Sequence, residues 1–275
     1  MFCENPVYKS YVNGIQSPDL ETFTRIKILI LGAGAKTPYF PGETDMIDQK
    51  ELHNKIYAGE NVIGHRKMKY VTEKFFLDMV RLADVKPWES VLDLGSGHGK
   101  FSNIYPKNII ATDIAKEASN FTKAQFVVAD ALFLPLKSET FDKIFCSEVI
   151  EHFPTQGSIK DSLSEMWRVL KPGGHAIIST PNENSLIGML RHLVKGYKEP
   201  PGSIHTSLVS IHGLKELLKR QGFEIEKVYT YLLPLPYPKY DYNLSYDAMK
   251  ILYHLGRIFP KLSHGIIIKV KKPKK

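Results

Sequence analysis

The stretch of sequence that decides the fold is Val91-Leu92-Asp93-Leu94-Gly95-Ser96-Gly97-His98-Gly99. Its first four residues predict a short buried strand, and its three alternating glycines predict a turn with few side chains. An extended ligand can pass close over such a turn at the carboxyl edge of a parallel sheet. On its own the segment could equally be a mere turn of glycines, so its meaning depends on the rest of the chain.

Around this stretch, from about residue 67 onward, helical and strand patterns alternate. Apolar residues at helical spacing predict helices at 68–80, 159–170, 214–218 and 246–258. Short apolar runs predict strands at 90–94, 108–112, 125–129, 142–146, 175–180, 223–230 and 265–270. Residues 171–174, Lys-Pro-Gly-Gly, are expected to separate the second helix from the strand that follows it. Alternation of this kind is typical of an α/β fold, in which helices cover a parallel sheet.

The composition of the 275-residue chain is that of an ordinary globular protein, with 43% hydrophobic and 24% charged residues. No apolar run approaches the roughly 20 residues that span a bilayer, and the first residues do not have the pattern of a secretion signal. Two cysteines, Cys3 and Cys146, are too few for a disulfide scaffold or a thiolate zinc site. We therefore expect a protein of the reducing cytoplasm.

The net charge of +8 raises the question of a nucleic-acid partner. Much of the excess comes from five lysines among the last seven residues: Lys269, Lys271, Lys272, Lys274 and Lys275. A solvated basic tail explains them most simply, with weak contact to a membrane surface, anionic lipid or RNA as the alternative. Because no stretch interleaves aromatic with basic residues, as base-stacking surfaces do, nucleic acid is not the expected partner.

Acidic or small residues also close the next three predicted strands. Asp113 follows the second strand, where it can accept hydrogen bonds from ribose hydroxyls. Asp130 and Ala131 follow the third and suit the amine and the ring of an adenine, while Ser147-Glu148 closes the fourth. No phosphate-loop lysine and no anion clamp accompanies them. The pattern therefore favours a ribose-bearing cofactor without phosphates, of which S-adenosylmethionine (SAM) is the common example.

Residues 91–99 resemble motif I of the class I SAM-dependent methyltransferases, and Asp113, Asp130-Ala131, Phe141–Ser147 and Leu170–Gly174 match later segments of that family. The resemblance covers about residues 65–230 and is strongest to the small-molecule branch that includes ubiquinone- and menaquinone-biosynthesis enzymes. It implies a Rossmann-like, seven-stranded, mostly parallel sheet with helices on both faces and an antiparallel last strand. The helices after residue 99 and after Asp113 look short for the family. The implied cofactor-binding residues are Asp93, Leu94, Gly95, Ser96, Gly97, Gly99, Asp113, Ile114, Asp130, Ala131, Ser147 and Glu148.

The chain is expected to divide at about residue 65. Residues 1–64 form an N-terminal extension to which the sequence assigns no role, and residues 65–275 form the expected methyltransferase domain. Within this domain, residues 231–262 are an insertion, rich in proline and tyrosine, that is too long for a hairpin turn. We expect it to be either a substrate cap or a structural cover over one face of the sheet.

Methyl transfer from a sulfonium is an in-line displacement, which needs alignment and in some cases a base. Glu148, Glu151 and His152 would share one face if their stretch were an α-helix. The pattern resembles the metal-binding motif of ubiquinone-pathway O-methyltransferases and part of that of small-RNA 2′-O-methyltransferases, although Phe153 replaces a histidine of the latter. The three residues are thus weak candidates for a divalent metal site, which the reaction does not require. His152 and His205 are the candidate catalytic residues, with an ordinary structural role as the alternative for each.

The sequence thus predicts SAM-dependent transfer of a methyl group to an O, N or C atom of a small molecule, such as a lipid, quinone or sugar precursor. One alternative is an RNA or protein methyltransferase, which the basic charge alone supports. Another is a SAM-binding subunit without catalysis. The intact acidic residues at 93, 113 and 130 are weighed against this last function.

Overall fold

The structure is a computed structural model that describes residues 69–105, 107–193, 207–234 and 245–274. These residues belong to one compact unit of the chain, residues 44–275. The predicted N-terminal extension, residues 1–64, and the candidate catalytic residue His205 lie outside the described residues.

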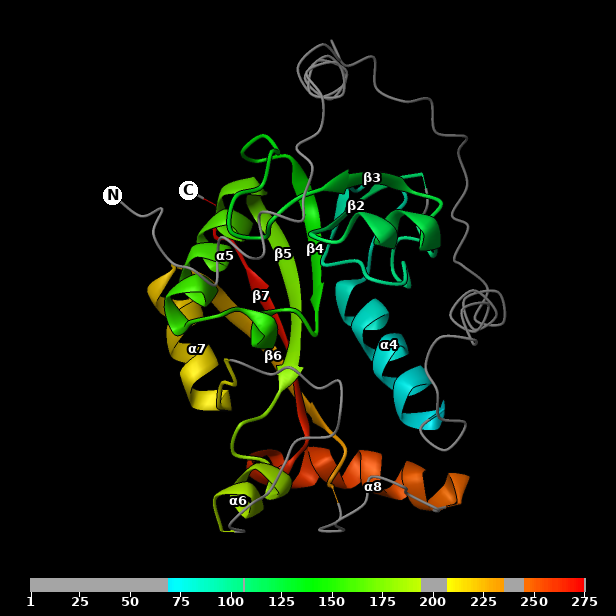
Figure 1. Cartoon of the computed structure of the whole chain (residues 1–275), viewed down its shortest axis with the longest axis vertical. Helices are drawn as coiled ribbons and strands as arrows, with labels where there is room; N and C mark the ends of the chain where they lie inside the picture. The colour runs from blue at the N-terminus through cyan, green and yellow to red at the C-terminus, as the bar shows by residue number, and fades with distance from the viewer. Residues whose placement is uncertain (1–68, 106, 194–206, 235–244, 275) are drawn as a thin grey trace. The chain divides into compact units, whose positions relative to one another are not determined.

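Seven strands form one sheet in the order β3-β2-β1-β4-β5-β7-β6 (Figure 1). They are β1 (Val91–Leu94), β2 (Ile109–Asp113), β3 (Gln125–Val128), β4 (Phe141–Ser147), β5 (Leu170–Pro181), β6 (Glu224–Tyr231) and β7 (Gly265–Lys271). Every pairing is parallel except the two that β7 makes, with β5 and with β6. The predicted α/β, Rossmann-like sheet with an antiparallel last strand is therefore confirmed.

The strand register brings the carboxyl ends of neighbouring strands to one edge of the sheet. Asp113, the last residue of β2, pairs with Val128, the last of β3. Ser147, the last residue of β4, pairs with Ser179 near the end of β5. Because ligands of open α/β sheets bind outside these carboxyl ends, residues far apart in the sequence are collected at one candidate site.

Helices cover both faces of the sheet (Figure 1). They are α4 (Lys69–Ala83), α5 (Gln156–Val169), α6 (Leu186–Leu193), α7 (Ile211–Arg220) and α8 (Tyr246–Ile258). Helices α4 and α8 pack on one face, in a core that includes Phe145 of β4 and Ile177 of β5. Helices α5 and α7 lie on the opposite face and bury Leu163 and Leu214. Among the described helices, none is long and apolar enough to cross a membrane.

The chain departs from the predicted elements between α5 and β5. Helix α5 ends at Val169 and β5 begins at Leu170, so Lys171–Gly174 lie within the strand instead of separating it from the helix. The register between β4 and β5 shifts at this point. Proline and glycine are tolerated at such an irregularity, since the ladder of hydrogen bonds is interrupted there in any case.

The connections on either side of β2 are short, as the sequence indicates. Turns follow Gly99, and a short 3-10 helix, η2 (Lys116–Phe121), follows β2. The described residues between β1 and β3 contain no α-helix.

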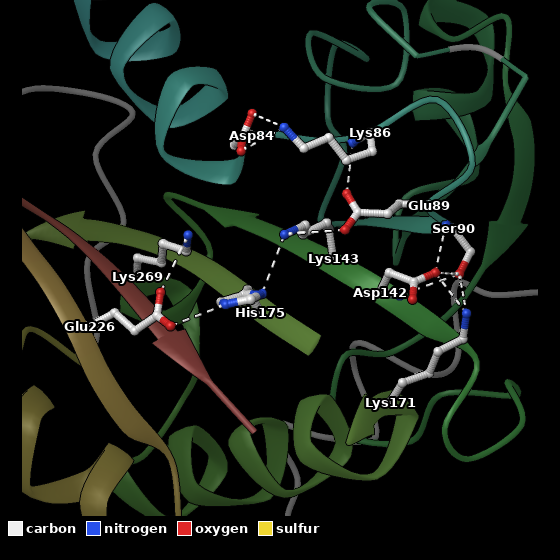
Figure 2. A network of polar contacts seen from close by, with 10 residues as sticks. All are labelled: Asp84, Lys86, Glu89, Ser90, Asp142, Lys143, Lys171, His175, Glu226 and Lys269. Atoms are coloured by element: carbon white, nitrogen blue, oxygen red, sulfur yellow. Dashed lines mark hydrogen bonds and ion pairs between the residues drawn. The ribbon is translucent and has the colours of Figure 1, made fainter. Parts of the chain in front are cut away.

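A polar network links the strands at the edge opposite to the glycine turn (Figure 2). Lys171 Nζ lies 2.7 Å from Asp142 Oδ2, which also accepts hydrogen bonds from the backbone N–H and the hydroxyl of Ser90. The buried Lys143 ammonium lies 3.4 Å from Glu89 Oε1. None of the ten residues drawn in Figure 2 is a predicted cofactor residue. The network has a structural role, because its contacts hold the amino ends of β1, β4 and β5 together.

Two of the C-terminal lysines are held by contacts within the fold, which corrects the prediction of a solvated tail for them. Lys269 belongs to β7 and lies 3.3 Å from Glu226 Oε2. Lys272 is buried, and its ammonium donates hydrogen bonds to the carbonyls of Trp167 at 2.9 Å and Leu170 at 2.8 Å. A charge pattern cannot reveal such contacts, because they depend on where the last strand enters the sheet.

Helix α8, in the insertion 231–262, covers the sheet face on which α4 also packs. Tyr253 is fully buried, and its hydroxyl donates a 2.7 Å hydrogen bond to Asp78 Oδ2 of α4. Met249 belongs to the same core. A structural cover, one of the two roles left open by the sequence, is thus present, and the cap remains a prediction.

Candidate functional site

The glycine turn after β1 has a backbone conformation that glycine adopts most easily. Gly95, Gly97 and Gly99 have φ angles of +69°, +47° and +67°. A Cβ atom at Gly95 would collide with the Val149 side chain, and one at Gly99 would lie 2.6 Å from Phe121 O. A Cβ atom at Gly97 would meet no atom within 4 Å. The turn is therefore closely packed at two glycines and open at the third, as a cradle for a ligand would be.

Asp113 connects the end of β2 to this turn. Its Oδ2 accepts a 2.8 Å hydrogen bond from Gly97 N, and its Oδ1 accepts a 2.9 Å hydrogen bond from Ala115 N. Each carboxylate oxygen can accept a second hydrogen bond, so Asp113 is still able to bind ribose hydroxyls. The neighbouring Ile114 is 42% exposed and offers an apolar surface to a planar ring.

Asp93 and Leu94 are buried under the turn and are not exposed to a ligand at their side chains. Asp93 accepts a 3.0 Å hydrogen bond from Ser102 N. Burial raises the pKa of Asp93 to about 7, opposed by the hydrogen bonds from Ser102 and supported by the nearby Asp113. Ser96 Oγ is buried and has no hydrogen-bond partner among the described residues. Asp93 thus helps to position the backbone around the turn. The Ser96 hydroxyl is left able to form a hydrogen bond with a ligand.

Asp130 and Ala131 lie half-buried just after β3. Asp130 Oδ1 accepts a 2.9 Å hydrogen bond from Leu132 N, which orients the carboxylate and leaves acceptor capacity for an amine. The structure thus brings Asp113 and Asp130 to adjacent strand ends, where the sequence predicts contacts with ribose and adenine.

The end of β4 continues into an acidic cluster that consists of the half-buried Glu148 and the buried Glu151, Ser179, Thr180 and Tyr231. Glu148 has a left-handed backbone, φ +55°, which costs a non-glycine residue about 1 kcal/mol. Its N–H donates to Ser179 O at 3.1 Å and to Ser179 Oγ at 3.2 Å. Thr180 Oγ1 donates to Glu151 Oε2 at 3.1 Å. Burial, together with the nearby Glu148, raises the pKa of the Tyr231 hydroxyl. Ser147 joins this edge through a 3.2 Å hydrogen bond from Ser179 Oγ.

The two carboxyl groups of the acidic cluster are weaker acids than ordinary glutamates. Burial raises the pKa of Glu148 to about 8, and the charge of Glu151 adds to the effect. Burial also raises the pKa of Glu151 to about 7, against the hydrogen bond from Thr180. Glu148 Oε1 is buried and has no hydrogen-bond partner among the described residues. An orphaned buried oxygen costs roughly 1–3 kcal/mol, which points to a role beyond the stability of the fold.

The stretch that holds the candidate metal ligands is not an α-helix, and this corrects the assumption that placed them on one face. Residues Ile150–His152 form a single 3-10 turn, η3. Glu148 and Glu151 still meet, but the His152 side chain is 51% exposed, with its Nε2 3.9 Å from Glu151 Oε1. In the part of the chain that the structure describes, no group of three or more His, Cys, Asp or Glu residues is arranged to hold a metal ion.

Ser179, Thr180 and Tyr231 are site residues that the sequence analysis does not include. They stand at the carboxyl ends of β5 and β6. Like Asp113 and Ser147, they are polar residues near strand ends, and this is the sequence signal that identifies them.

A cavity of about 1030 Å³ lies beside the edge strand β6. It contains none of the predicted cofactor residues. Its lining includes Asn182, His212, Lys215, Thr230, Arg257 and Lys261. The cavity borders the acidic cluster along the chain, because Thr230 precedes Tyr231 and Asn182 follows Thr180 by two residues.

The edge formed by β1, β2 and β3 fits SAM. The open space at Gly97, the carboxylates of Asp113 and Asp130, the exposed Ile114 and the unsatisfied Ser96 hydroxyl match an adenosine without phosphates.

Comparison with known proteins gives the same result. Residues 65–228 match the family described as "Methyltransferase domain". A protein of Mycolicibacterium smegmatis named as a probable S-adenosylmethionine-dependent methyltransferase is 29% identical over 62% of this chain and 65% of its own length. A tRNA (carboxymethyluridine(34)-5-O)-methyltransferase of Arabidopsis thaliana is 32% identical, over 50% of this chain and only 34% of its own length.

Solved structures share the fold. A SAM-dependent methyltransferase from Archaeoglobus fulgidus superposes with a TM-score of 0.50 at 20% identity, covering 82% of this chain and all of that one. A methyltransferase in complex with the Trm112 activator from Haloferax volcanii gives a TM-score of 0.55 at 16% identity, covering 82% of this chain and 97% of that one. Together with the family match and the cofactor edge, these likenesses lead to one conclusion: the chain belongs to the class I SAM-dependent methyltransferases, and SAM is its cofactor.

Proposed function

We propose that the chain methylates an oxygen or nitrogen atom of a small amphipathic molecule. The observation that carries this proposal is the cavity beside β6, whose volume of about 1030 Å³ is at the upper end of the range for small-molecule sites. Met189 and Leu262 contribute apolar surface, and Lys215 and Lys261 contribute positive charge. None of the described residues that line the cavity carries a carboxylate. An acceptor with an apolar body and a polar or anionic end is complementary to such a lining.

The insertion 231–262 supports the same proposal. Arg257, Pro260, Lys261 and Leu262 all belong to it and line the cavity. The insertion therefore has two parts: α8 covers one face of the sheet, and the residues at its end line the cavity proposed for the acceptor. We propose that it acts as the substrate cap expected from the sequence.

Methyl transfer to a panel of acceptors tests the proposal. Labelled SAM is offered with quinols, lipid-like phosphates and hydroxylated acids, and with bulk tRNA in a separate arm. We expect label in amphipathic small molecules only. Val228→Trp, which places an indole in the cavity lining, should raise KM for the acceptor about tenfold or more and leave SAM affinity unchanged. Ile251→Trp, at an exposed position of α8, is the matched control.

A tRNA acceptor is the second candidate, favoured by the name of the plant relative and by the net charge of +8. The contacts of Lys269 with Glu226 and of the buried Lys272 with the end of α5 reduce the charge free for RNA. Label found in tRNA alone would overturn the small-molecule proposal. Binding to tRNA that weakens steeply with salt would then be expected as well.

A further inference from the structure

Exposed apolar side chains gather where α6 and α8 stand at the carboxyl end of the sheet, at the bottom of Figure 1. Ile258, the last residue of α8, is 67% exposed, Phe259 is 47% exposed, and Met189 of α6 is 50% exposed. Met189 lines the same cavity as Arg257 of α8, so these side chains belong to one surface. Single exposed apolar residues are common on folded proteins, whereas a group of them marks a surface that contacts another molecule.

The backbone that carries the exposed residues at the end of α8 is held by polar contacts on both sides. Arg257 Nη2 lies 2.5 Å from Asp78 Oδ2 of α4. Asn182 Nδ2 donates a hydrogen bond to the carbonyl of Lys261 at 3.1 Å. Residues 257–262, here called the end segment, are therefore fixed to the fold while their apolar side chains remain in water.

The charge around the end segment is positive. Residues 248–264 include Lys250, Arg257 and Lys261 and contain no aspartate or glutamate. Lys215 of α7 lines the same cavity as Lys261. Because Arg257 is already in an ion pair, the attraction for an anionic partner comes mainly from the three lysines. Apolar side chains interleaved with basic ones are complementary to the headgroup boundary of an anionic membrane.

We propose that the end segment, together with Met189, docks the protein on an anionic membrane surface. Ile258 and Phe259 enter the boundary between the headgroups and the acyl chains, and the lysines contact the lipid phosphates. Three residues of the segment line the cavity, so docking brings the cavity to the bilayer. The inference rests on the proposed function in one respect: an amphipathic acceptor then enters the cavity directly from the membrane.

Co-sedimentation of the full chain with lipid vesicles tests the docking without knowledge of the acceptor. One set of vesicles consists of phosphatidylcholine alone, and in the other set roughly one third of the lipid is phosphatidylglycerol. We expect the chain to bind the anionic vesicles about tenfold or more tightly than the neutral ones, because each lysine near an anionic surface contributes about fivefold.

Three variants locate the contact. Ile258→Ser combined with Phe259→Ser should weaken binding to the anionic vesicles about tenfold or more, because two apolar side chains no longer leave water. Lys261→Gln should weaken it about fivefold and leave binding to neutral vesicles unchanged. Trp88→Ser is the matched control: its side chain is 68% exposed but precedes β1, at the amino end of the sheet, so vesicle binding should not change. Thermal unfolding verifies that each variant is folded.

A fluorescent reporter in the end segment gives a second measurement that does not depend on a loss of binding. Phe259→Trp places an indole at the proposed contact, and its emission should shift to shorter wavelength when anionic vesicles are added. The unaltered chain, whose two tryptophans are Trp88 and Trp167, should show no such shift because both stand outside the end segment.

Failure of the unaltered chain to bind anionic vesicles would overturn the inference, and so would equal binding by the double serine variant. A dimer that dissociates in this variant, without any vesicle binding, would assign the surface to a second copy of the chain and overturn the inference as well. The acceptor panel is a separate test: label in tRNA would refute the proposed acceptor but leave the docking in place. Failure to bind vesicles would leave a small amphipathic acceptor standing.

Discussion

At the scale of single residues, the three glycines of the turn are required for different reasons. Gly95 and Gly99 are enclosed by neighbouring atoms, whereas Gly97 faces open space. The sequence pattern shows all three alike, because spacing reveals where glycines stand but not what each one faces. The same limit applies to Glu148 and Glu151, which meet through a 3-10 turn instead of the helical face expected from their spacing.

Alanine at these glycines should separate stability from cofactor binding. Gly97→Ala should cost only about 1 kcal/mol of stability, for its left-handed backbone, but should weaken SAM binding because the methyl group enters the cradle. Gly95→Ala should lower the melting temperature more than Gly97→Ala does, because the new methyl group collides with the Val149 side chain. Adding Val149→Ala to the Gly95→Ala variant should restore part of the lost melting temperature. Thermal unfolding and calorimetry measure the two effects. Equal loss of stability in both variants would contradict this distinction.

At the scale of secondary-structure elements, the spacing of apolar residues predicts the sheet. Segments with helical spacing alternate with short apolar runs, and each spacing indicates which side chains are buried. The boundaries of β5 were not predictable in the same way. Pro172 and Gly173 ordinarily end an element, but β5 continues through them: Leu170 pairs with Phe141 of β4, and the Gly173 N–H donates to Lys272 O at 2.7 Å. The prediction of a solvated basic C-terminus is wrong at Lys272 for a similar reason, since this lysine binds the end of α5 through tertiary contacts.

The contact of Lys272 with α5 should be a stabilising helix cap. Its ammonium lies at the carbonyl end of the helix dipole and 5.3 Å from the centre of the Trp167 ring. Lys272→Met should lower the free energy of unfolding by about 1–2 kcal/mol. Lys274→Met, at an exposed position, should have no measurable effect. Denaturant unfolding compares the two, and equal midpoints would argue against the cap.

At the scale of the whole molecule, the site makes the stability of the ligand-free protein dependent on pH. Asp93, Glu148 and Glu151 have folded-state pKa values raised to about 7, about 8 and about 7, against ordinary unfolded values near 4. Between these limits the folded protein holds more protons than the unfolded chain, so its stability falls as pH rises. His175, whose pKa is lowered by burial, acts in the opposite direction.

The melting temperature of the ligand-free protein should therefore decrease from about pH 5.5 to about pH 8.5. Glu148→Gln should flatten the profile in the absence of SAM. Differential scanning calorimetry across this range measures the effect. A melting temperature that rises toward pH 8.5 would be incompatible with the raised pKa values.

The place of β7 in the sheet has a consequence for the order of events during synthesis. β7 lies between β5 and β6 although it follows both in the sequence. While the ribosome is still translating residues 265–271, β5 has one unpaired edge and β6 has no strand beside it. The growing chain must therefore keep these two unpaired strand edges apart from other chains until β7 emerges, which makes this moment the one at which a chaperone would matter most.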